Sequence, residues 1–165
     1  MKRLKNLALI VLLLFSINTF AQDNKKGTEA PNWVAKDING KVYSLTDFAG
    51  KYIMIDVWAT WCGPCRNEIP HYAKIIKKYK GRNIQFLSIS IDSKLKRWKD
   101  FISKEEIGSL QLIDERADSS PYVTAYRITG IPRFIIINPE GKIVEWIAPR
   151  PSSIELDKLL AKLLK

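Results

Sequence analysis

Two cysteines separated by two residues are the side chains of this sequence best suited to do chemistry. Cys62 and Cys65 are the only cysteines among 165 residues, and a pair at this spacing can alternate between a dithiol and a disulfide. The cysteine count excludes a disulfide-dense scaffold and a four-thiolate metal site. The single histidine, His71, excludes most histidine-rich metal centres and is expected to face solvent. The pair therefore indicates thiol–disulfide redox chemistry.

The elements predicted around the pair are those that would make one thiol reactive. Residues 52–58 form an apolar run that predicts a buried strand, and apolar residues recur at helical spacing over about 63–80. At a helix start, unpaired N–H groups and the helix dipole favour a thiolate, so Cys62 is expected to be the nucleophile. Cys65 lies one turn further along the same face and is expected to resolve the mixed disulfide.

Three alternatives compete with redox chemistry as the reason for the pair. A structural disulfide would close a ring of only four residues, which would stabilise the fold weakly. A zinc site needs two further ligands, which one histidine cannot supply. Chance spacing does not account for the position of the pair between a predicted strand and a predicted helix, the context that redox function requires.

The rest of the chain predicts an α/β domain with a mixed sheet covered on both faces. A turn signal between residues 33–35 and 41–44 indicates an N-terminal β-hairpin. Ser152 and Glu155 predict a capping box for a last helix. Further strands are expected at 84–91, 110–113, 133–137 and 142–147, helices at 95–105 and 121–127, and a turn at 47–50.

The segment around the cysteines resembles the active site of thioredoxin. Residues 55–65 read IDVWATWCGPC, Pro70 matches the helix-kinking proline of that family, and residues 130–133 resemble the loop that carries its cis-proline. The N-terminal hairpin, an αβ segment inserted around 94–127 and Glu68 resemble the exported TlpA/ResA-like branch more closely. The resemblance implies a thioredoxin fold, with a mixed central sheet flanked by helices, an N-terminal β-hairpin and an inserted αβ segment.

Two acidic residues are candidates for moving protons at this site. Asp56 lies alone among apolar residues of the predicted strand, where a carboxylate must be protonated part of the time or paired. The resemblance assigns it proton transfer with the buried thiol of Cys65; the alternative is an acid that escapes to a cavity rim. The resemblance also gives Glu68 a part in tuning the thiols and in specificity, the alternative being an exposed helix residue. If both acids lie near Cys65, repulsion should raise at least one pKa.

The resemblance also implies a substrate-binding edge beside the thiols. It predicts a cis peptide bond before Pro132, which would place the backbone of Ile131 beside Cys62 to pair with an extended substrate segment. Trp61 is expected to be a partly exposed lid over the thiols. The stretch 148–151 reads Ala-Pro-Arg-Pro where the family usually places a glycine near the groove, which bears on substrate breadth. The expected substrate-binding residues are Trp61, Gly63, Pro64, Ile131 and Pro132.

The first residues predict export. A basic start is followed by the apolar run 7–15 and by a more polar stretch up to Ala21, the order of a secretory signal peptide. We expect a cleaved signal peptide over 1–21, a flexible leader over 22–29 and a thioredoxin-like domain over 30–165, in the periplasm or outside the cell. The alternative is an N-terminal membrane anchor, for which the apolar segment is short.

Charge and composition exclude one further class of protein. The formal net charge is +10, but no basic helix carries interleaved aromatic residues, so nucleic acid is not expected as a partner. We predict an exported enzyme, acting as a monomer, that reduces protein disulfides through Cys62 and Cys65 without a metal or organic cofactor. Its expected partners are protein thiols and disulfides, with a membrane electron donor if it works as a reductase. The alternatives are a peroxiredoxin-like peroxidase and a non-enzymatic thiol metallochaperone. The direction of electron flow and roles such as cytochrome c maturation stay open.

Overall fold

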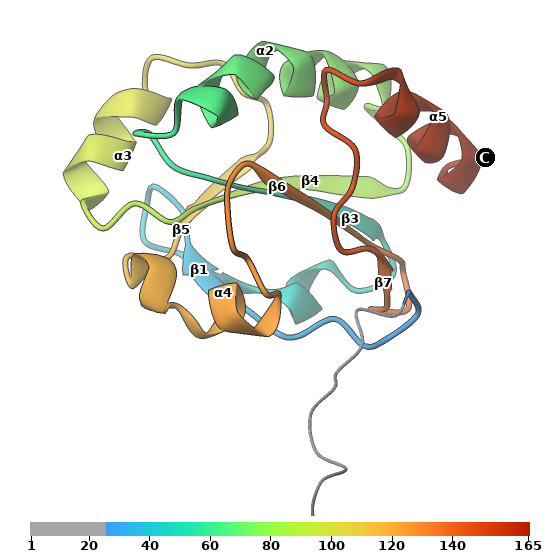
Figure 1. The fold of residues 1–165 in the computed structure, drawn as a ribbon, viewed down its shortest axis with the longest axis horizontal. Coiled ribbons are helices and arrows are strands. Elements are labelled where there is room, and N and C mark those ends of the chain that lie inside the picture. Colours follow the sequence, from blue (N-terminus) through green and yellow to red (C-terminus); the bar gives the residue numbers. More distant parts are fainter. Residues whose placement is uncertain (1–25) are drawn as a thin grey trace, which may run out of the picture.

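Strands and helices alternate along the chain around one seven-stranded sheet (Figure 1). The computed structural model describes residues 26–165, and the predicted signal peptide over 1–21 lies outside these residues. Within the described part of the chain, no helix has the length and apolar character needed to cross a membrane.

Most elements lie close to where the sequence predicts them. The strands are β1 (Val34–Lys36), β2 (Val42–Ser44), β3 (Tyr52–Trp58), β4 (Ile84–Ser90), β5 (Leu110–Ile113), β6 (Arg133–Ile137) and β7 (Ile143–Glu145). The helices are α2 (Gly63–Lys78), α3 (Leu95–Ile102), α4 (Pro121–Ala125) and α5 (Ile154–Leu163), with short 3-10 helices η1 (Leu45–Phe48) and η2 (Ala117–Ser119). The turn expected at 47–50 begins inside η1, because Asp47 accepts the N–H of Ser44 and caps that short helix.

The sheet has the strand order β2-β1-β5-β4-β3-β6-β7. β3, β4 and β5 run parallel, whereas β6 runs antiparallel to β3. β3 therefore lies inside the sheet, which explains its almost unbroken apolar sequence. The one acid in that run, Asp56, is in register with Ser88 on β4 and Phe134 on β6.

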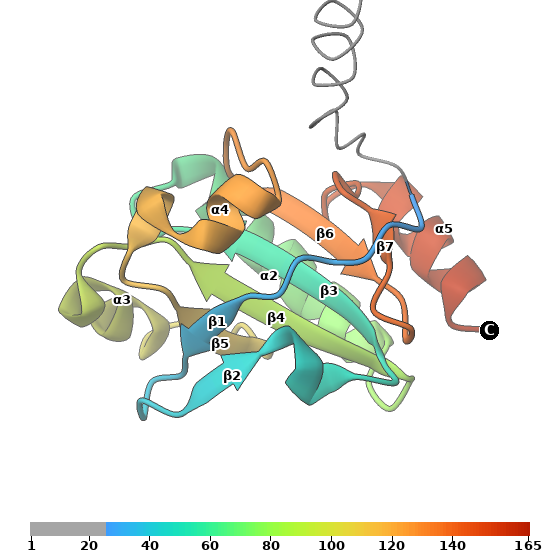
Figure 2. The same ribbon diagram turned by 90° about the horizontal axis from the view of Figure 1, so that it is seen from below.

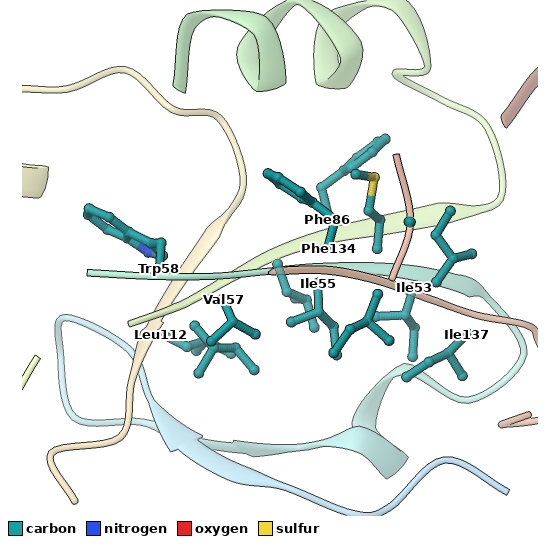
Figure 3. Packing of buried hydrophobic residues seen from close by; sticks show 14 of the residues in the cluster. Ile53, Ile55, Val57, Trp58, Phe86, Leu112, Phe134 and Ile137 are labelled. Atoms are coloured by element: carbon teal, nitrogen blue, oxygen red, sulfur yellow. The ribbon is translucent and has the colours of Figure 1, made fainter. Parts of the chain in front are cut away.

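Alternation along β3 divides its side chains between the two faces of the sheet. Ile55 and Val57 point away from α2, whereas Trp58 points to the side of α2 (Figure 3). Trp58 packs there against Phe101 of α3, with ring centroids 5.4 Å apart. By the same alternation, Asp56 lies on the α2 side of the sheet. α2 and α5 cover that face, and α4 lies on the other (Figure 1).

The first described residues pair with the edge of β7. The N–H of Gly27 donates to the carbonyl of Ile143, and the N–H of Ile143 donates to the carbonyl of Thr28, each at 2.8 Å. Part of the stretch 22–29, where a flexible leader is expected, is thus hydrogen-bonded, because it satisfies backbone groups that the last strand of the sheet would expose. The chain then crosses the face opposite α2 to reach β1 (Figure 2).

The predicted start of the last helix is wrong by one residue. Ser153, not Ser152, is the N-cap residue of α5, and its hydroxyl oxygen accepts the N–H of Glu155 at 3.2 Å. The two serines are adjacent, so the sequence pattern fits either of them. The side chain of Ser152 instead hydrogen-bonds to Glu68 on α2.

Candidate active site

A buried carboxylate holds the loop between β3 and α2. Asp92 is 1% exposed, and it accepts the N–H of Thr60 at 2.8 Å and the hydroxyl of Thr60 at 2.7 Å. The hydroxyl of Ser90 donates to the same carboxylate at 2.7 Å. The N–H of Cys62 donates to the carbonyl of Ala59 at 3.0 Å, which turns the chain toward α2. These bonds fix the point at which Cys62 enters the helix.

Cys62 and Cys65 form a disulfide across the first turn of α2. Their Cα atoms are 5.2 Å apart. Cys62 is the N-cap residue of the helix, and its Sγ accepts the N–H of Cys65 at 3.1 Å. That N–H is one of the donors without an intrahelical partner at a helix start, and it would face a Cys62 thiolate after reduction. Pro64 lies in the same first turn, where a missing N–H costs no helical bond.

The disulfide is buried, but its loop is open on one side. Cys62 and Cys65 are 5% and 3% exposed, whereas Trp61 is 56% exposed. Pro64 is exposed and Gly63 is partly exposed. A cavity of about 260 Å³ beside this tryptophan is lined by Trp61, Ile91, Ser93, Ala117 and Asp118. Trp61 and Pro64 are therefore exposed side chains next to the disulfide.

Asp56 is a buried acid whose Oδ1 has no hydrogen-bond partner. Its side chain is on the face of the sheet that α2 covers, and both Glu68 and Tyr72 of that helix interact with it electrostatically. Burial raises the pKa of the Asp56 carboxyl well above its ordinary value, and the negative charge of Glu68 raises it further. The disulfide form of the protein therefore favours a protonated Asp56.

Glu68 lies on the same buried face of α2 as Cys65. It is 6% exposed, so it is not an exposed helix residue. Its Oε2 accepts the backbone N–H of Ser152, and its Oε1 accepts the hydroxyl of Ser152, each at 2.9 Å. The structure thus brings both predicted acids to the side of the sheet on which the disulfide lies.

The peptide bond between Ile131 and Pro132 is cis, as the family resemblance predicts. Both residues are partly exposed and immediately precede β6. β6 pairs with β3 at Arg133 and Val57, near the point where β3 ends. Ile131 and Pro132 therefore lie at the end of the sheet where β3 leads into the loop that carries Cys62.

The stretch 148–151 begins beside the same end of the sheet. The N–H of Ala148 donates to the carbonyl of Phe134 at 2.8 Å. The preceding residue, Ile147, is 65% exposed. The stretch leads directly into Ser152, so it connects this end of the sheet to the contact with Glu68.

Two residues that shape the site, Asp92 and Ser152, are not identified by the sequence patterns. Asp92 follows β4, which runs parallel to β3, and neighbouring parallel strands end at the same edge of a sheet. That placement is the signal that could have indicated its contact with Thr60. Ser152 is 84 residues from Glu68 in sequence, and no local pattern predicts the contact.

The side chains gathered here can transfer electrons and protons. The two sulfurs can pass between a disulfide and two thiols, and the carboxyl of Asp56, on the same side of the sheet, can exchange a proton. Across residues 26–165, no group of three or more His, Cys, Asp or Glu side chains is arranged to hold a metal ion.

Known proteins with similar sequences match most of the chain. A family model described as the AhpC/TSA family matches residues 26–146. The thiol-disulfide oxidoreductase ResA of Bacillus cereus is 28% identical over 146 residues, which cover 87% of this chain and 83% of that protein. The ResA of Bacillus subtilis is 30% identical over 120 residues, which cover 73% of this chain and 65% of that protein.

Solved structures resemble this fold over a similar span. The crystal structure of a candidate thiol-disulfide oxidoreductase from Bacteroides vulgatus has a TM-score of 0.80 and 37% identity, covering 87% of this chain and 100% of that one. The thioredoxin domain of another Bacteroides vulgatus thiol-disulfide oxidoreductase has a TM-score of 0.78 and 30% identity, covering 86% of this chain and 99% of that one. The predicted thioredoxin-like fold is confirmed.

Proposed function

Because this chain belongs to the AhpC/TSA family and its homologues are thiol–disulfide oxidoreductases, we propose that it reduces protein disulfides outside the cytoplasm. The observation that carries the proposal is the position of Cys62 as N-cap residue of α2, with Cys65 one turn later. The reducing direction is supported by Gly63 and Pro64 between the cysteines, the pair that the resemblance shares with thioredoxin. Thioredoxin is a reductant, with a potential of about −270 mV.

The proposed cycle transfers two electrons to the substrate. In the reduced protein, the Cys62 thiolate attacks a substrate disulfide, which forms a mixed disulfide and releases one substrate thiolate. Cys65 then loses its proton and attacks the Sγ of Cys62, which forms the Cys62–Cys65 disulfide and releases the second substrate thiolate. A thiol donor outside the cytoplasm, such as a membrane protein, must then reduce the disulfide again.

Asp56 is the proposed acceptor of the Cys65 proton. A carboxyl whose pKa is raised by burial suits this role, because it holds a proton while the cysteines are oxidised. It would return that proton to Cys65 when the disulfide is reduced. Glu68 would act through its charge, which raises the proton affinity of Asp56.

The proposed docking edge lies beside the exposed loop of α2. An extended substrate segment would pair with the backbone of Ile131, as an added strand. Trp61, Gly63, Pro64 and Pro132 would line the approach, and their exposure supports this arrangement.

The direction of electron flow is tested by equilibrating the protein with glutathione and glutathione disulfide. We expect a reduction potential below about −220 mV, which would make the reduced protein a donor to most other disulfides. The oxidised fraction is measured by alkylating the free thiols and determining the masses of the products by mass spectrometry. A potential near about −120 mV, that of a strong oxidant, would contradict the reducing direction and leave the reaction class intact.

Export is the second part of the proposal, and it depends on the residues before the described domain. The basic start and apolar run support a signal peptide over 1–21, followed by a leader over 22–29 and the domain over 30–165. The mass of the protein recovered from its producing cells should correspond to a chain that begins at Gln22. A full-length chain held in the membrane fraction would instead favour the anchor.

A further inference from the structure

The loop before α5 holds one of the two buried acids by both of its oxygens. The N–H and the hydroxyl of Ser152 donate to Oε2 and Oε1 of Glu68, each at 2.9 Å. Hydrogen bonds donated to both oxygens favour a charged carboxylate over a neutral acid. Asp56 is equally buried, at 6% exposure, but its Oδ1 has no partner. Hydrogen bonds therefore stabilise the charged form of Glu68, whereas one oxygen of Asp56 has no such stabilisation.

The other groups around Asp56 carry no compensating charge. Its register partners are Ser88 and Phe134, and neither is charged. Tyr72 faces it from α2, and burial and the charge of Asp56 raise the pKa of this tyrosine well above its ordinary value, so it stays neutral. Among residues 26–165, no ion pair involves Glu68. The charge of Glu68 thus acts on Asp56 without being neutralised by a cation.

We propose that Ser152 is a positioning residue that keeps Glu68 as the charged member of the two acids, so that Asp56 is the member that takes and returns the proton. This rests on the proposed function, in which Cys65 loses a proton in each cycle. Two interacting carboxyls with similar proton affinities would share one proton between them. Ser152 removes that ambiguity and directs the proton to the acid on β3.

The adjacent serine provides a matched control. Ser153 is the N-cap residue of α5, and its side chain is hydrogen-bonded to Glu155 rather than to Glu68. Removing its hydroxyl weakens the helix start, as loss of an N-cap does. Ser152→Ala and Ser153→Ala therefore both disturb the same loop, but only the first removes a hydrogen bond from Glu68.

The test is a carboxyl titration of the oxidised protein by NMR, with carbon-13 in the side-chain carboxyls. In Ser152→Ala, the titration midpoint of Asp56 should fall, because the charged form of Glu68 loses one hydrogen bond while the backbone bond remains, and a less fully charged Glu68 raises the pKa of Asp56 less. Ser153→Ala should leave this midpoint unchanged, and Ser152→Thr should restore it. In Glu68→Gln, the midpoint of Asp56 should fall, because the neighbouring charge is gone.

Two results would overturn the proposal. The first is an Asp56 midpoint that is the same in Ser152→Ala as in the parent, whatever the change in stability. The second is an Asp56 midpoint that does not respond to Glu68→Gln. The titration does not require the protein to be catalytically active. If the protein failed to reduce protein disulfides, the proposed function would be contradicted, but the titration would still show whether Ser152 acts on the two acids.

Discussion

Replacement of Cys62 by serine is expected to abolish reduction of a protein disulfide, with a loss of about 1,000-fold or more in rate. A serine hydroxyl cannot replace the thiolate nucleophile, even at the start of α2. Cys65→Ser is the matched control, because it keeps the attacking thiol and removes the resolving one. This variant should accumulate a mixed disulfide with the substrate, measured as a covalent adduct by mass spectrometry.

The same pair of variants separates the alternatives. If Cys62→Ser turned over like the parent, the proposed mechanism would be wrong. A peroxiredoxin-like peroxidase needs a single peroxidatic cysteine, so rapid consumption of one equivalent of peroxide by Cys65→Ser, which oxidises the Cys62 thiolate to a sulfenic acid, would favour that alternative. A metallochaperone would show neither activity and would instead bind copper through the reduced pair.

Asp56→Asn is expected to stabilise the oxidised protein in a pH-dependent way. Burial and Glu68 raise the pKa of Asp56 above the ordinary value, so the folded state binds the proton more tightly than the unfolded state. The free energy of unfolding of the parent therefore falls as the pH rises from the ordinary pKa of an aspartate toward the raised pKa of Asp56 in the folded protein. At about pH 8 the amide should be the more stable of the two, by about 1.4 kcal/mol for each pH unit by which the folded protein raises the pKa of Asp56. At about pH 4 the difference should largely vanish.

Urea unfolding of both proteins at the two pH values measures this effect. Asp118→Asn is a suitable control, because it makes the same chemical change at an exposed residue, which lines the cavity near Trp61. A stability difference for Asp56→Asn that is equal at both pH values would contradict a proton held by Asp56. The variant should also resolve mixed disulfides about 100-fold more slowly, because its amide cannot accept the Cys65 proton.

Local patterns in the sequence predict most of the fold. The apolar run of β3 and the helical spacing of α2 place both elements within two residues of their bounds, and the turn between β1 and β2 fixes the hairpin. The spacing of Cys62 and Cys65, together with their position between β3 and α2, is sufficient to indicate thiol–disulfide exchange. Each of these signals is contained in a short stretch of chain, where backbone preference and burial pattern agree.

The contacts that the sequence does not predict join distant segments. Asp92 reaches Thr60 from a neighbouring strand, and Ser152 reaches Glu68 from the other end of the domain. The assignment of the α5 cap to Ser152 fails for the same reason, because tertiary contact decides which of two adjacent serines caps the helix. Such pairings depend on the three-dimensional packing of whole elements, which residue spacing does not encode.

The pairing of Gly27 and Thr28 with β7 also limits how copies of this molecule can associate. An unpaired sheet edge is a template on which another chain can add strands and grow into fibrils. Here one edge is occupied by the protein's own backbone, and the opposite edge, β2, is only three residues long. Neighbouring molecules therefore find little unpaired backbone at these two edges on which to extend the sheet.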